Sequence, residues 1–128
     1  METIVEEKIE IASELLAQIA VQVEKQVTVH GIIYGDKNVI YSVRVWPSIY
    51  LIPKGSNHRC RLLHHFNITF YPEWQPIKPN ETLRFTLVFE GLPADCAHFD
   101  LMEIIPEPGG FEVININRNN EDVYTLVI

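Results

Sequence analysis

The sequence predicts an all-β fold, an antiparallel β-sandwich preceded by one short α-helix. From about Val21 to the end of the chain, apolar residues alternate with polar ones at a period of two, which is typical of strands. Clusters of glycine, proline, asparagine and aspartate interrupt this alternation, as turns do between the strands of a sandwich. We therefore divide the chain into a helical extension, residues 1–18, and a sandwich domain, residues 19–128.

The helical extension has a composition and a spacing that favour a helix. Residues 1–18 lack glycine and proline and are rich in Glu, Ala and Leu. Thr3 and Glu6 have the spacing of a capping box. The apolar residues of one helical face are Val5, Ile9, Ala12, Leu16 and Ile19. A strand is the alternative, because Ile9 and Ile11 alternate with Glu10. An amphipathic helix rarely stays folded alone, so we expect it to pack on the sandwich or on a partner, or to mediate self-association.

The alternating part of the chain predicts a series of short strands. They are expected at residues 21–23, 27–33, 39–45, 49–52, 60–65, 82–90, 99–105, 111–116 and 123–128. The clearest is 82–90, whose inward residues are expected at the centre of the core: Leu83, Phe85, Leu87 and Phe89. Three prolines within residues 72–79 predict an extended connection that crosses between two sheets, as Greek-key topology requires.

Two stretches of the sequence resemble immunoglobulin-like domains. The alternate residues Asp95, Ala97, Phe99 and Leu101 are similar to the turn that leads into strand F of immunoglobulin domains, although Phe99 replaces the tyrosine and Leu101 the cysteine. Residues 20–116 also resemble uncharacterised bacterial immunoglobulin-like accessory domains, most often met in Bacteroidetes. The similar motifs are the strand sequences at 27–30, 49–51, 85–93 and 99–103. This resemblance implies an interaction module and carries over no catalytic residue.

Composition limits the partners and the compartment. The formal net charge of −7, from 17 acidic and 10 basic residues, argues against nucleic acid and anionic membranes as partners. The sequence has no apolar run of membrane-spanning length and no basic, apolar leader, so we expect a cytoplasmic protein. In that compartment Cys60 and Cys96 are expected as small hydrophobic residues and not as a disulfide.

One cluster has the residue types of a zinc site. His58, Cys60, His64 and His65 offer nitrogen and sulfur donors. They fall in an expected strand, however, where neighbouring side chains point to opposite faces, so we predict no metal site and no cofactor. The carboxylates of Glu103 and Glu107 are expected on a solvated surface. A metal-dependent hydrolase built on the histidines is therefore the least favoured function.

The aromatic residues near the prolines are the candidate contact residues. Trp74 and Tyr71 lie in or beside the proline-rich connection, and Trp46 precedes Pro47, although core packing is the favoured interpretation for Trp46. These residues suggest a non-enzymatic protein-interaction or accessory module. The alternative is a carbohydrate- or small-ligand-binding module in which a ring stacks on the exposed aromatics.

Overall fold

The computed structural model describes residues 26–128, which form nine strands and no helix. The expected helix over residues 1–18 and the expected strand over residues 21–23 lie outside the described residues. The strands are β1 (Val27–Tyr34), β2 (Tyr41–Val43), β3 (Ile49–Pro53), β4 (Cys60–Phe66), β5 (Gln75–Ile77), β6 (Thr82–Phe89), β7 (His98–Glu103), β8 (Glu112–Asn117) and β9 (Val123–Val127). Within this range no helix is long and apolar enough to cross a membrane.

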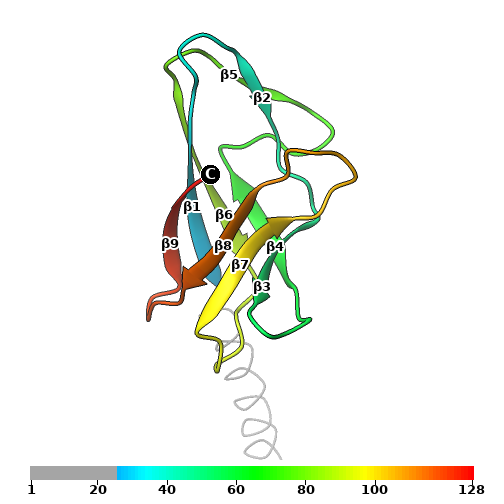
Figure 1. Cartoon of the computed structure of the whole chain (residues 1–128), viewed down its shortest axis with the longest axis vertical. Helices are drawn as coiled ribbons and strands as arrows, with labels where there is room; N and C mark the ends of the chain where they lie inside the picture. Colours follow the sequence, from blue (N-terminus) through cyan, green and yellow to red (C-terminus); the bar gives the residue numbers. More distant parts are fainter. Residues whose placement is uncertain (1–25) are drawn as a thin grey trace, which may run out of the picture.

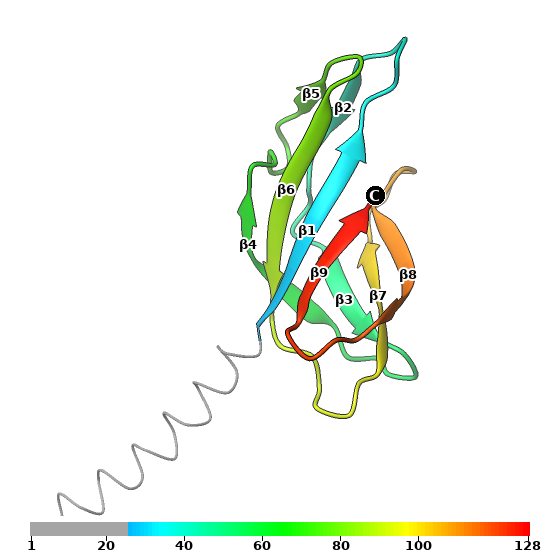
Figure 2. The same cartoon turned by 90° about the vertical axis from the view of Figure 1, so that its left-hand side faces the viewer.

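Seven of the strands form one continuous sheet that folds over on itself. Its order is β8-β7-β3-β4-β6-β1-β9, while β2 and β5 form a separate two-stranded sheet at one end of the molecule (Figure 1). β4 belongs to both halves of the large sheet: it pairs with β3 at Cys60 and Arg61, then with β6 from Leu62 onward, with a register shift between Leu62 and His64. The result is a sandwich-like, nearly barrel-shaped arrangement, as predicted at this level (Figure 2).

The core lies between the two halves of the sheet. The side chains of Leu83, Phe85, Leu87 and Phe89 are at most 5% exposed, which confirms the prediction for the 82–90 strand. Gly31 of β1 is paired with Phe85, and a Cβ atom built on Gly31 would lie 2.2 Å from Cζ of the phenylalanine ring. Glycine at this position therefore makes room for a large aromatic side chain across the pair of strands.

The proline-rich segment reaches the two-stranded sheet through β5 but returns to the large sheet beside β4, so it is not the crossing that the sequence-based expectation placed there. Residues 67–81 join β4 to its antiparallel neighbour β6 and contain β5. The crossing is made by residues 90–97, which carry the chain from β6 to β7, beside β3, so that the spatial order is β7-β3-β4-β6. The prolines disrupt the strand ladder locally, but they do not determine which strand comes next to which.

A fully antiparallel sandwich is also a wrong expectation, because β9 pairs with β1 in parallel. The chain crosses from β8, at one edge of the large sheet, and enters β9 beside the start of β1, where the Thr28 N–H donates to the Asp122 carbonyl.

The turn before β9 is held by a buried ion pair. Arg118 donates from Nε to Asp122 Oδ1 over 3.1 Å and from Nη2 to Oδ2 over 3.0 Å, and the Tyr124 hydroxyl donates to the same carboxylate. The two charged side chains are only 14% and 9% exposed. This bidentate pair anchors the last strand to the domain.

Candidate functional site

The expected contact residues Trp46, Tyr71 and Trp74 come together around one residue that the sequence did not single out, Arg44. Antiparallel pairing of Val43 with Gln75 places the next residue of each segment, Arg44 and Trp74, side by side. A bridge between Val45 and Phe70 then brings Trp46 close to Tyr71. Backbone pairing of residues 43–46 with residues 70–75 thus assembles the cluster.

The guanidinium of Arg44 lies against all three aromatic rings. Its Cζ atom is 3.7 Å from the ring centroid of Trp74, 4.7 Å from that of Tyr71 and 5.3 Å from that of Trp46. The Trp46 and Tyr71 rings are themselves 3.9 Å apart between centroids. Each such cation–π contact contributes about 0.5–2 kcal/mol, depending on how well the pair is shielded from water, so the rings have fixed positions.

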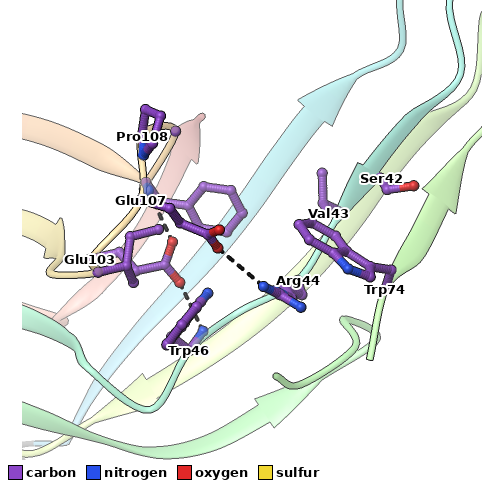
Figure 3. Close-up of a pocket in the computed structure, with 11 residues that line it drawn as sticks. Ser42, Val43, Arg44, Trp46, Trp74, Glu103, Glu107 and Pro108 are labelled. Carbon is purple, nitrogen blue, oxygen red and sulfur yellow. Dashed lines mark hydrogen bonds and ion pairs between the residues drawn. The ribbon is translucent and has the colours of Figure 1, made fainter. Parts of the chain in front are cut away.

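Hydrogen bonds hold the guanidinium in place. Nη2 donates to Glu107 over 3.1 Å, as Figure 3 shows. Nη1 donates to the Pro72 carbonyl over 2.8 Å. The Arg44 side chain is 11% exposed, and its buried Nε has no hydrogen-bond partner among the described residues. The positive charge of Arg44 is therefore covered and locally balanced by Glu107.

Glu103 is buried, which corrects the expectation of a solvated carboxylate. Its Oε2 accepts the Trp46 N–H over 2.8 Å and its Oε1 accepts the Phe111 N–H over 3.1 Å. Burial raises the pKa of Glu103 above the usual carboxyl range, against these two bonds and the charge of Arg44, which lower it. The carboxylate thus ties the segment of Trp46 to the loop between β7 and β8.

A small cavity of about 140 Å³ adjoins the cluster. Its lining includes Ser42, Arg44, Trp74, Glu103 and Glu107 (Figure 3). Trp74 is 54% exposed and Tyr71 is 40% exposed, while Trp46 is half-buried. We call Arg44, Trp46, Tyr71 and Trp74 the aromatic cluster.

The four residues with the donor types of a zinc site do not converge. His58 lies in the exposed loop before β4, Cys60 is buried and His64 is exposed on the strand. His65 stacks on Phe70 with 4.6 Å between ring centroids. Within residues 26–128 no three His, Cys, Asp or Glu side chains lie close enough together to hold a metal ion.

Sequence reasoning missed Arg44 and misplaced Glu103. A signal existed for Glu103, because it continues the inward alternation of Phe99 and Leu101 along β7. No comparable signal existed for Arg44, since its role depends on the pairing of two segments about 30 residues apart. Comparison of the chain with protein-family models, curated proteins and solved structures finds no match, so the site stands on its own geometry.

Proposed function

We propose that this chain is a non-enzymatic protein-interaction domain and that Tyr71 and Trp74 form the centre of its contact surface. The supporting observation is that both rings stay exposed although Arg44 and Trp46 hold them in position. Large aromatic side chains and arginine dominate binding energy at protein interfaces. Rings that are already ordered lose little conformational entropy on binding, which favours affinity.

The charge around the aromatic cluster favours a partner segment with basic side chains. Glu73 is exposed between the two contact residues, while the charges of Arg44 and Glu107 balance one another. The whole chain carries a net charge of −7. A basic partner is therefore attracted at long range and meets the Glu73 carboxylate beside the aromatic rings.

The polar groups of the cluster support binding more than catalysis. Glu103 already accepts two backbone N–H groups, and Glu107 is paired with Arg44. A general acid or base needs a free, reachable oxygen beside the reacting group. Both carboxylates are instead engaged within the domain, Glu103 with two backbone donors and Glu107 with Arg44.

We also propose that the sandwich is immunoglobulin-like. The order β7-β3-β4-β6, with the fourth strand returning beside the first, supports a Greek-key arrangement. Relationship to the bacterial accessory domains, residence in the cytoplasm and a contact made by residues 1–18 stay predictions.

The proposal is tested by selecting ligands from a random peptide library displayed on phage. Selection uses the full wild-type chain, and the affinity of each selected peptide is then measured on the wild type and on the Trp74→Ala variant. We expect sequences rich in lysine and arginine, and a loss of at least about 2 kcal/mol, or roughly 30-fold in Kd, on Trp74→Ala. The control is Ile114→Ala on β8, because Ile114 has the same exposure of 54% and lies outside the aromatic cluster.

Circular dichroism first establishes that both variants are folded. Selected peptides that bind the Trp74→Ala variant as tightly as the wild type would overturn the proposed surface. Enrichment of acidic peptides would overturn the proposed partner chemistry while leaving the surface intact.

Carbohydrate binding is the second candidate, and one observation favours it. The Trp74 ring has one face against Arg44 yet is 54% exposed, which leaves ring surface on which a sugar can stack. Quenching of tryptophan fluorescence by members of a glycan panel, lost in Trp74→Ala, is the expected result for this role. If glycans quench and no peptide is selected, the carbohydrate role replaces the protein-interaction role.

A further inference from the structure

A second surface, separate from the aromatic cluster, lies on the outside of strands β4, β6, β1 and β9 (Figure 2). The register places Phe66, Thr86, His30 and Thr125 side by side in one row across these strands. A hydrogen bond of 2.9 Å joins His30 Nδ1 and Thr86 Oγ1, so these two side chains lie on the same face of the sheet. We call this surface the outer face.

The outer face carries little charge on a strongly acidic chain. Among the outward positions of β1, β6 and β9, Arg84 is the only Asp, Glu, Lys or Arg. Half of the other ten are threonine or histidine, and the apolar ones include Val127 and Val123, which are 61% and 41% exposed. Exposed sheet faces usually carry charged residues, so the scarcity of charge, together with these exposed valines, favours an interaction surface.

The lack of charge favours a second copy of the chain as the occupant. Two molecules that each carry a net charge of −7 repel one another wherever carboxylates meet. The strand positions of the outer face bring no carboxylate to such a contact. A strongly acidic partner, in contrast, would find only Arg84 and Arg61 at the outward positions of these strands, and Arg61 is already paired with Glu90, so burial of most of its charges would be uncompensated.

The shape of the outer face suits a two-fold symmetric pair. An open hollow of about 350 Å³ lies between Phe66 and Thr125, with Ile32 and Arg84 also in its wall. The Phe66 side chain is 54% exposed beside this hollow. In an isologous dimer the same patch serves both molecules, so each Phe66 ring can enter the hollow of the other copy.

The extent of the outer face is of the order that a dimer needs. With a rise of about 3.3 Å per residue and about 4.8 Å between strands, the four strands cover roughly 400 Å² in plan. Because side chains project from the strands, the solvent-accessible area of the outer face exceeds this flat area and approaches the roughly 800 Å² that each partner buries in a standard interface.

We propose that two copies of this chain associate face to face through the outer face, with Phe66 and Thr125 near the two-fold axis. The inference does not depend on the proposed function, which uses another part of the surface. It also differs from the expectation that residues 1–18 mediate self-association.

Sedimentation velocity of the full chain across a wide concentration range tests the proposal. We expect a reversible monomer–dimer equilibrium for the wild type. Thr125→Glu places two carboxylates near the axis and should weaken the dimer by at least about 30-fold in Kd, partly reversed by added salt. Phe66→Ala removes the inserting ring and should weaken the dimer without a salt effect. The matched control is Ile114→Glu on the exposed side of β8, which should leave the dimer unchanged.

Thermal unfolding checks that each variant is folded. If Thr125→Glu does not fold, the effect of Phe66→Ala on the dimer tests the proposal. A wild type that stays monomeric at the highest concentration overturns the proposal. A dimer that persists in both Thr125→Glu and Phe66→Ala also overturns it. A further variant, Leu16→Glu, places a charge on the helical face expected within residues 1–18. Loss of the dimer in this variant alone would assign the contact to residues 1–18 instead.

Discussion

Substitution of Gly31 by alanine should destabilise the domain through one identifiable clash. The new Cβ atom would lie 2.2, 2.6 and 2.7 Å from three carbon atoms of the Phe85 ring, Cζ, Cε2 and Cε1. Carbon atoms in proteins normally stay about 3.5–4.0 Å apart, so the ring must retreat by more than about 1 Å. Phe85 is 2% exposed and belongs to the hydrophobic core, so a movement of its ring disturbs the packing of the residues around it.

The expected loss is about 1–2 kcal/mol in the free energy of unfolding. Overpacking of a core costs about 1–3 kcal/mol, while the lower chain entropy of alanine relative to glycine returns about 0.4–1 kcal/mol. Phe85 also stacks on Phe111 with 6.1 Å between ring centroids, and Phe111 lines the cavity of the aromatic cluster. Displacement of Phe85 should therefore also disturb the site.

A double-mutant cycle measures the clash directly. Leucine at position 85 lacks all three of the clashing ring atoms, so Gly31→Ala should cost far less in a Phe85→Leu background. Urea unfolding, followed by tryptophan fluorescence, should give a coupling free energy of about 1–2 kcal/mol between the two positions. Additive effects, or a Gly31→Ala variant as stable as the wild type, would refute the packing argument.

Three further predictions concern buried polar groups and thiols. Asp122→Asn should lower the free energy of unfolding by about 3–5 kcal/mol, because it leaves the buried Arg118 guanidinium without its counter-charge; urea unfolding measures the loss. Glu103→Gln should lower stability by about 1–3 kcal/mol, because an amide oxygen accepts only one of the two N–H bonds and the amide nitrogen faces the other donor. Alkylation at mildly alkaline pH should modify Cys96 well before Cys60, because Cys60 is buried and burial raises its pKa to about 11; peptide mass mapping after timed alkylation measures both rates.

The Asp122→Asn prediction has a matched control, and both it and the alkylation prediction have an outcome that contradicts them. Asp122→Asn is compared with Arg61→Gln, because the Arg61–Glu90 pair is exposed and its loss should cost less than about 1 kcal/mol. An Asp122→Asn cost as small as that of the control contradicts the buried-pair argument. Equal alkylation rates for the two cysteines contradict the burial argument.

Glu103 also predicts a pH dependence with a definite sign. Its folded-state pKa is raised by burial, so the folded protein binds the proton more tightly than the unfolded chain. Its contribution to stability therefore falls as pH rises from the usual carboxyl range through the raised pKa. Subtracting the Glu103→Gln profile isolates this slope from groups such as Glu90 and Asp100, whose pKa values are lowered and whose contributions run the opposite way. A difference that does not change with pH would contradict the shift.

The sequence by itself determined which side chains point inward along the most regular strands. Alternation is a local property of extended backbone, so the buried set in β6 and the burial of Val27 and Val29 in β1 follow from it. It also singled out Trp46, Tyr71 and Trp74 as residues beside breaks in that alternation.

Only the tertiary structure decided how the strands are arranged and what surrounds the aromatic residues. The parallel pairing of β9 with β1, the location of the crossing at residues 90–97 and the meeting of Arg44 with Trp74 all depend on contacts between segments distant in the sequence. Alternation assigns a side to each residue but not a neighbour, because any two strands of matching pattern can pair. The pairing that is adopted depends on the packing of the whole core, where Gly31 admits the Phe85 ring and Glu103 finds two backbone donors.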